Sequence, residues 1–228
     1  MLFFNSSRRR VLNKKTFNQL LGHAKIMAQD SKGLKVLHLE DGRYLKLFRY
    51  RNVLSIKRYM DALRFAAHAE ILKRRGIPTV SVLNWVWIPH LRRSGIFYEP
   101  LDGCTLRQIV AVGKMNSDLV IQLGAFFAEL HQKGIYYRSL HMGNVILCPN
   151  KKLGLIDILD MQTYPWPLRA ALRLRNFRHL FRHSQDTKAL SDAGIEHFIQ
   201  GYLKTCWRPR FETKMRTEIK KWLSQMDV

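Results

Sequence analysis

Four polar residues of the chain have the types and the order that phosphoryl transfer requires. Lys46 stands among the apolar residues of Leu45–Phe48, and a lysine with such neighbours needs an anionic partner. Glu70 follows on a predicted helix and could direct that lysine toward a phosphate. Asn144 and Asp157 carry oxygen ligands of the kind that Mg²⁺ prefers. Together they predict a nucleotide phosphate site with a magnesium ion.

Each of these residues also has a purely structural interpretation. Lys46 could lie at a strand edge with its ammonium group in solvent, and Glu70 could be an exposed helix residue. Asn144 could be a turn former, and Asp157 could be a helix N-cap. Chemistry is favoured because all four occur in one order around the predicted connector Phe97–Gly103.

Two kinds of periodicity position these residues in the first half of the chain. Residues Gly33–Phe48 alternate apolar and polar types around Asp41-Gly42, which is a strong signal for a two-residue hairpin turn. The segment Ser55–Arg75 has helical spacing and stops at Gly76, as a helix end should. Two further strands are predicted over residues 79–88 and 95–99.

The second half of the chain is predicted to be mainly helical. Ser117 is the expected N-cap of a helix whose apolar residues recur at helical spacing up to Gly134. The short apolar runs Val145–Leu147 and Leu153–Ile156 then indicate a small hairpin, and beyond Pro165 the spacing is helical to the end.

The order of these elements predicts an α+β protein with two lobes. The predicted parts are a small β-rich N-lobe over residues 1–98, a hinge connector over 99–104 and a helical C-lobe over 105–228.

Composition limits the class of protein and of partner. The 228 residues are 46% hydrophobic and 25% charged, which indicates a globular chain rather than a disordered one. The formal net charge is +22, from 39 Lys and Arg against 17 Asp and Glu. Such a charge favours anionic partners, namely nucleic acid, an acidic membrane leaflet or a phosphorylated substrate.

The cysteines and the N-terminus predict the compartment. Cys104, Cys148 and Cys206 form no C-x-x-C pair, which favours free thiols in a reducing compartment. Residues Met1–Arg10 place apolar residues before charged ones, the reverse of a secretory signal. Since there is no run of about 18 apolar residues, we expect a cytoplasmic protein that lies against a membrane.

Several segments between residues 30 and 160 resemble one known family. The chain resembles protein-kinase-like phosphotransferases, in particular the lipopolysaccharide-core (Kdo or heptose) kinase family and its branch called toluene-tolerance proteins. The segments that carry the resemblance are Leu45–Phe48, Phe65–Thr79, Tyr98–Arg107, Leu130–Val145 and Gly154–Ile158.

The resemblance implies a fold, cofactors and roles for residues. It implies a two-lobed protein-kinase-like fold that binds ATP and Mg²⁺. Lys46 would contact the α- and β-phosphates, Glu70 would hold Lys46, and Glu99 would meet the adenine edge. Asn144 and Asp157 would bind magnesium. The implied acceptor is a sugar of the lipid-linked core oligosaccharide at the cytoplasmic face of the inner membrane.

Two departures from the family pattern affect the predicted catalysis. The segment Asp30–Gly33 offers a single glycine where a glycine-rich loop is expected, so phosphate would depend more on Lys46 and on metal. Ser139 replaces the loop carboxylate that acts as base, and such base help is typically worth ~10²–10⁴-fold. His141 and Asp160 are the candidate substitutes, although His141 could equally hold the loop by hydrogen bonds.

A basic segment follows the predicted metal site. On a helix beginning near Pro167, an apolar stripe leaves much of the remaining surface to arginines. Such a helix suits an acidic lipid interface, and arginine forks also suit phosphorylated sugars. An ordinary helix with a solvated face is the alternative. The stripe is Leu168, Ala171, Leu172, Phe177, Leu180 and Phe181; the arginines are Arg169, Arg173, Arg175, Arg178 and Arg182.

The predicted function is therefore that of an ATP-dependent kinase phosphorylating a sugar of the lipopolysaccharide core. Because Ser139 replaces the loop carboxylate, turnover stays open. The first alternative is a nucleotide-binding pseudokinase or scaffold in envelope biogenesis or solvent tolerance. The second is a small kinase-like protein acting with RNA, although no helix-turn-helix, RNA-binding aromatic motif or Cys/His finger occurs.

Overall fold

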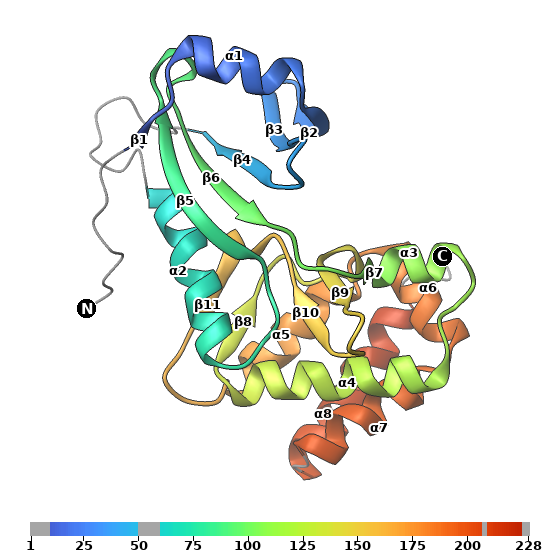
Figure 1. Ribbon diagram of the computed structural model, residues 1–228. Coiled ribbons are helices and arrows are strands. Elements are labelled where there is room, and N and C mark those ends of the chain that lie inside the picture. Colours follow the sequence, from blue (N-terminus) through green and yellow to red (C-terminus); the bar gives the residue numbers. More distant parts are fainter. Residues whose placement is uncertain (1–9, 50–59, 207–208, 225–228) are drawn as a thin grey trace. The chain divides into compact units, whose positions relative to one another are not determined.

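The computed structural model describes residues 10–49, 60–206 and 209–224 (Figure 1). The chain forms two compact units. The first unit contains the residues up to Arg74 together with Thr79–Leu101, and the second contains Arg75–Pro78 and the residues from Asp102 onward. The lobe boundaries and the hinge role predicted for residues 99–104 stay predictions.

A six-stranded sheet forms the centre of the first unit. Its strand order is β1-β5-β6-β4-β3-β2, and all neighbours are antiparallel except β1 and β5. The strands are β1 (Arg10–Val11), β2 (Lys25–Asp30), β3 (Gly33–His38), β4 (Tyr44–Phe48), β5 (Ser81–Ile88) and β6 (Arg93–Glu99).

The predicted hairpin is confirmed as β3 and β4, in which Val36 pairs with Lys46. Gly42 has a φ of +82°, which glycine adopts readily. The Asp41 carboxylate accepts the backbone N–H of Arg43 at 3.0 Å, so the turn is held by its own side chain.

Two helices accompany the sheet, α1 (Lys14–Gly22) and α2 (Met60–Arg74). The first was not predicted, although Asn13 caps it by accepting the N–H of Thr16 at 2.9 Å. The predicted helix over Ser55–Arg75 is confirmed from Met60 to Arg74, and its first five residues lie outside the described part. A short helical turn, η2 (Pro89–Leu91), joins β5 to β6. The buried core of this unit contains Leu12, Phe17, Leu37, Leu39, Leu45, Leu47, Val86, Ile88 and Phe97.

The second unit is mainly helical, with two small sheets of order β10-β9-β7 and β11-β8. Its helices are α3 (Leu106–Ala111), α4 (Ser117–Gln132), α5 (Ala170–Leu180), α6 (Ser184–Asp192), α7 (Ile195–Thr205) and α8 (Pro209–Ser224). Its strands are β7 (Cys104–Thr105), β8 (Ile135–Tyr137), β9 (Val145–Leu147), β10 (Leu153–Leu155) and β11 (Met161–Thr163), with helical turns η3 (Met142–Asn144) and η4 (Ile158–Asp160).

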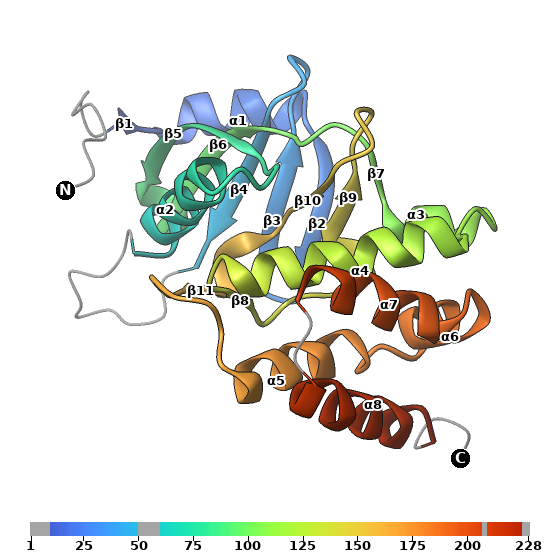
Figure 2. The ribbon, with the colours of Figure 1, turned by 90° about the horizontal axis from the view of Figure 1, so that it is seen from below.

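Close packing of α4 on α7 organises this unit. Figure 2 shows α7 alongside α4 and α8 alongside α5. A Cβ atom on Gly124 would lie 2.0 Å from the Phe198 carbonyl oxygen, and one on Gly201 would lie 1.9 Å from that of Ile121. The two backbones can approach this closely only because both positions are glycine. Buried aromatic rings fill the adjoining space: Phe127, Phe177, Phe198 and Tyr202.

The predicted α+β class is confirmed, with a sheet-based first unit and a helical second unit. Among the described residues, no helix combines the length and apolar character needed to cross a membrane.

Candidate functional site

The loop Arg138–Asn144 is held at both ends by small sheets of the second unit. It leaves β8, in which Tyr137 pairs with Met161 of β11, and it leads into β9. The backbone N–H of Arg138 donates to the Asp160 carbonyl oxygen at 3.3 Å. This register brings the loop beside Asp160.

Ser139 and Asp160 meet through their side chains. The Ser139 Oγ donates to Asp160 Oδ2 at 3.3 Å. A carboxylate therefore stands within hydrogen-bond reach of the position where the loop lacks one. It comes from the chain after β10 rather than from the loop itself.

Asn144 and Asp157 flank the β9–β10 hairpin. Val145 pairs with Leu155, and the Asn144 carbonyl accepts the Ile156 N–H at 3.0 Å, so both residues belong to one end of the hairpin. The Asn144 Nδ2 donates to the Ser139 carbonyl at 2.9 Å, which orients its side chain. Two oxygen donors at one hairpin end fit a magnesium ion that keeps other positions for water and phosphate oxygens.

The backbone at Asp157 is unusual. Its φ is 53° and its ψ is 46°, a left-handed conformation that residues other than glycine rarely adopt. The Tyr137 hydroxyl donates to the carbonyls of Ile156 and Asp157 at 2.6 Å and 2.8 Å. Strained backbone of this kind recurs at functional sites, and here a buried tyrosine from β8 holds it.

His141 stabilises the loop. Its Nδ1 accepts the N–H of Gly143 at 3.1 Å, and its ring lies 4.9 Å from that of His183. Burial, followed by the neighbouring Arg107 guanidinium, lowers the pKa of His141. These contacts agree with the alternative in which His141 holds the loop by hydrogen bonds. A role of His141 as a base stays a prediction.

Two residues that the sequence analysis missed anchor the same loop. Asp186 of α6 is 1% exposed and accepts the N–H of Met142 at 2.8 Å. Arg107 of α3 donates to both Asp186 oxygens at 2.9 Å and 3.0 Å. A buried carboxylate requires such partners. Arg107 ends one of the segments that carry the family resemblance, but no role was predicted for it, and Asp186 belongs to none of those segments.

Three predicted site residues belong to the first unit. Lys46 is half-buried on β4, its Nζ 5.3 Å from the centre of the Phe65 ring, and its neighbours Leu45 and Leu47 are buried as predicted. Glu70 lies on α2 with its Oε1 3.5 Å from Arg74 Nε, one turn along the same helix. The structure therefore gives Glu70 a partner that the sequence analysis did not name, and its pairing with Lys46 stays a prediction.

Glu99, the third of these residues, ends β6 and is exposed, paired in register with Ser81. Its contact with adenine stays a prediction.

The glycine-poor turn between β2 and β3 is held by side chains. Asp30 accepts the N–H of Lys32 at 2.9 Å, and Arg93 donates to the carbonyls of Lys32 and Leu34. Gly33 has a φ of +103°. The turn is thus fixed by an arginine from β6.

The prediction that Arg173 meets an acidic partner is wrong. Arg173 is 1% exposed and donates to the Leu168 carbonyl at 2.7 Å, the Tyr202 hydroxyl at 2.9 Å and Cys206 Sγ at 2.8 Å. It lies on the buried face of α5 with Phe177. These acceptors satisfy its Nε and Nη1 atoms, and its buried Nη2 has no hydrogen-bond partner among the described residues. Of the predicted stripe, Ala171 is exposed. The other four arginines are exposed: Arg169, Arg175, Arg178 and Arg182.

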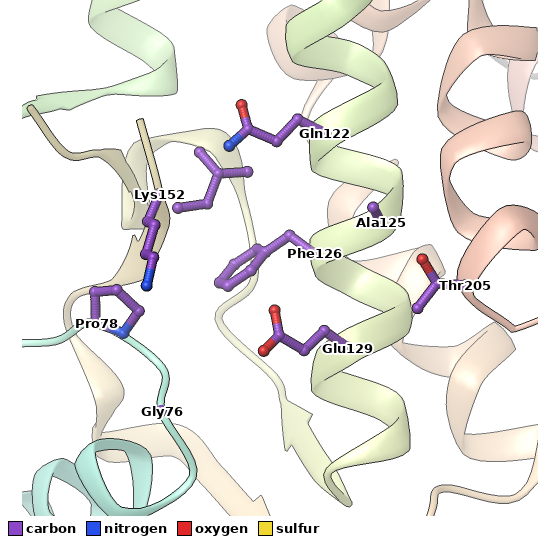
Figure 3. Close-up of a pocket in the computed structure, with 9 residues that line it drawn as sticks. Gly76, Pro78, Gln122, Ala125, Phe126, Glu129, Lys152 and Thr205 are labelled. Carbon is purple, nitrogen blue, oxygen red and sulfur yellow. The ribbon is translucent and has the colours of Figure 1, made fainter. Parts of the chain in front are cut away.

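A cavity of about 380 Å³ lies in the second unit between α4, the β9–β10 turn and Gly76–Pro78. Figure 3 shows Gln122, Phe126 and Glu129 extending from α4 toward it. None of the predicted site residues lines this cavity.

The sequence of the chain matches one known protein family. The family described as lipopolysaccharide kinase (Kdo/WaaP) matches residues 41–202. No curated protein matches the chain.

Among solved structures, the bifunctional kinase-methyltransferase WbdD has 16% sequence identity and a TM-score of 0.47, over 85% of this chain and 47% of that one. The second is a divergent kinase that lacks the glycine-rich loop and regulates membrane ultrastructure of the Toxoplasma parasitophorous vacuole. It has 16% sequence identity and a TM-score of 0.42, over 94% of this chain and 70% of that one. The chain spans about half the length of WbdD. Because the family match extends over more than half of the residues, the chain belongs to the lipopolysaccharide kinase (Kdo/WaaP) family.

Proposed function

We propose that the chain is an ATP-dependent phosphotransferase that phosphorylates a sugar of the lipid-linked lipopolysaccharide core at the cytoplasmic membrane face. The family assignment supports the reaction class. The observation that carries the proposal is the grouping of Ser139, Asn144 and Asp160 around one loop, with Asp157 at the same end of the following hairpin.

Binding of the nucleotide would use residues of known placement in each unit. Lys46 Nζ would bind nucleotide phosphate, Glu70 would orient Lys46, and Glu99 would meet the adenine edge. Asn144 and Asp157 would hold Mg²⁺, which when bound neutralises charge on the transferring phosphoryl group.

The proton of the acceptor hydroxyl would pass to Asp160. As the acceptor oxygen bonds to the γ-phosphorus and the bond from that phosphorus to the bridging oxygen of ADP breaks, the acceptor proton moves to the Asp160 carboxylate. Ser139 Oγ already donates to that carboxylate and would keep it beside the loop. Since the transition state is loose, late proton removal suffices.

The location proposed for this reaction rests on charge. The net charge of +22 and the exposed arginines of α5, Arg169, Arg175, Arg178 and Arg182, favour an acidic membrane surface or an anionic lipid-linked acceptor.

Ser139 favours a second candidate function, that of a nucleotide-binding pseudokinase. A kinase that has lost turnover no longer needs the loop carboxylate, and a hydroxyl can replace it. The two candidates differ at Asp160, which only an active enzyme requires.

Thermal melting with and without Mg-ATP tests nucleotide binding. At 100-fold over Kd, a ligand stabilises its protein by about 2.7 kcal/mol, and we expect this in the wild type. Asp157→Ala should abolish the stabilisation, whereas Asp192→Ala, which removes an exposed carboxylate from α6, should keep it. No stabilisation of the wild type would contradict both candidates. Transfer of labelled γ-phosphate to isolated core oligosaccharide then separates enzyme from pseudokinase.

A further inference from the structure

A tyrosine and a histidine join the loop's first strand to the basic helix. The Tyr136 hydroxyl lies 3.0 Å from His179 Nε2, and the two ring centres are 6.0 Å apart. Tyr136 belongs to β8, which leads directly into Arg138, and His179 belongs to α5. The contact brings the last turn of α5 beside the start of the loop.

Four exposed arginines belong to the two segments that this pair joins. Arg175, Arg178, His179 and Arg182 stand at positions i, i+3, i+4 and i+7 and so share one face of α5 and its end. Arg138 follows β8, and all four guanidinium groups belong to exposed residues. Burial lowers the pKa of His179 to about 4, and the charges of Arg182, Arg175, Arg138 and Arg178 add to that effect. The charges of all four arginines therefore act on the same imidazole.

These arginines have no acidic partner in the described part of the chain. Other arginines there do, since Arg107 pairs with Asp186 at 2.9 Å and Arg216 pairs with Glu196 at 2.6 Å. In residues 10–49, 60–206 and 209–224, no carboxylate lies within 4.0 Å of Arg138, Arg175, Arg178 or Arg182. The ion pairs present there use other arginines and lysines, and His23.

The chemistry of these exposed guanidinium groups points to an anionic ligand. Grouped guanidinium forks are the geometry that binds phosphate oxygens, and a patch of one sign without counter-charges attracts an anion.

We infer that Arg138, Arg175, Arg178 and Arg182, on the two segments joined by the Tyr136–His179 contact, form a binding site for a phosphate group. Because Arg138 is adjacent to Ser139, the site would hold a phosphate already present on the acceptor while a hydroxyl of that acceptor meets the loop. The identification of this ligand as the acceptor rests on the proposed function; the phosphate site itself does not. Arg169 is outside the site, since it caps the opposite end of α5.

Inorganic phosphate is the first probe, used without nucleotide and at constant ionic strength. Phosphate should raise the Tm of the wild type, and the double variant Arg175→Gln, Arg182→Gln should weaken phosphate binding by ~10-fold or more. The matched control is Lys188→Gln, Lys220→Gln, which removes two exposed charges from α6 and α8 and should bind phosphate like the wild type. The Tm of each variant without phosphate verifies folding.

The inference is overturned if phosphate has no effect on the wild type, or if phosphate binding is weakened equally in both double variants. Equal weakening by Arg169→Gln and Arg175→Gln would likewise show diffuse attraction instead of a site. Asp157→Ala should keep phosphate binding, so failure of nucleotide binding and failure of this site appear in separate measurements.

Competition identifies the source of the phosphate. Vesicles of phosphatidylcholine containing phosphatidic acid would displace inorganic phosphate if the site takes a lipid headgroup. If the site takes a sugar phosphate, glucose 6-phosphate would displace inorganic phosphate and the vesicles would not. Displacement by either competitor supports the site. If neither competitor displaces inorganic phosphate, the inference is overturned.

Discussion

The hydroxyl of Ser139 donates a hydrogen bond to the carboxylate of Asp160 at 3.3 Å. The two residues lie 21 positions apart and meet because β8 and β11 pair antiparallel, with Tyr137 opposite Met161. A carboxylate missing from the loop is therefore supplied at the neighbouring strand. The hydroxyl of Ser139 is thus bonded to the carboxylate that we propose as the proton acceptor.

Replacing Asp160 should affect turnover far more than replacing Ser139. If Asp160 accepts the proton, Asp160→Asn should lower kcat by ~10²–10⁴-fold, with Mg-ATP stabilisation retained. Ser139→Ala removes only a hydrogen-bond donor, so a loss of about tenfold or less is expected. The measurement is the rate of γ-phosphate transfer to core oligosaccharide, with Asp192→Asn as control. Unchanged kcat in Asp160→Asn would assign the base elsewhere.

Asp186→Asn should loosen the loop and destabilise the protein. The substitution leaves the Arg107 guanidinium without its charged partner, and breaking a buried pair costs about 3–5 kcal/mol. Since Arg107 is 35% exposed, we expect about 2 kcal/mol, measured by urea unfolding. The control Glu196→Gln breaks the solvent-exposed pair with Arg216 and should cost less than about 1 kcal/mol. Similar losses in the two variants would contradict an anchoring role for Asp186.

Gly201→Ala should be among the most damaging small substitutions. Its Cβ would lie 1.9 Å from the backbone oxygen of Ile121, so α4 and α7 would have to separate. Overpacking of this kind costs ~1–3 kcal/mol or more, despite the better helix propensity of alanine. Gly22→Ala, where no atom lies within 4 Å of the added Cβ, should leave the Tm unchanged or raise it. Equal Tm values for the two variants would show that α4 and α7 can shift freely.

Local signals explain which parts of the fold were predictable. The Asp41-Gly42 turn and the periodic apolar residues of α4 depend on neighbours a few positions away, and both elements are where the sequence predicts them. The β9–β10 hairpin, and with it the common placement of Asn144 and Asp157, follows from equally local patterns.

Long-range contacts explain what was missed. Arg107 and Asp186 are 79 positions apart, and nothing in either neighbourhood marks the carboxylate as buried. Arg173 is a charged residue at a buried position of α5. Its burial depends on the acceptors of Leu168, Tyr202 and Cys206, and the last two are distant in the sequence. The Ser139–Asp160 contact needed the register of β8 and β11, which no pattern in the sequence specifies.

His131 is fully buried where α4, α5, α7 and β8 meet. Its Nε2 lies 3.1 Å from Asn176 Oδ1, and its Nδ1 lies 3.0 Å from the Tyr202 hydroxyl. Asn176 Nδ2 donates to the Tyr137 carbonyl at 2.7 Å, so its oxygen accepts from His131. Arg173 donates to the Tyr202 hydroxyl, so that hydroxyl donates to Nδ1. The network requires a neutral imidazole.

Burial lowers the pKa of His131 to about 3, from 6.5, with the nearby Arg173 charge acting in the same direction. Below pH 6.5 the unfolded chain therefore binds a proton that the folded chain does not, and the stability present above pH 6.5 is lost as pH falls toward 3. Between pH 7.5 and pH 5 this residue should lower the free energy of unfolding by about 2 kcal/mol. Urea unfolding at both pH values measures the difference, and His131→Gln, with every other titrating group retained, should reduce it by that amount. An unchanged pH dependence in the variant would mean that the imidazole gains a proton in the folded protein, so that Nδ1 no longer accepts the Tyr202 hydroxyl.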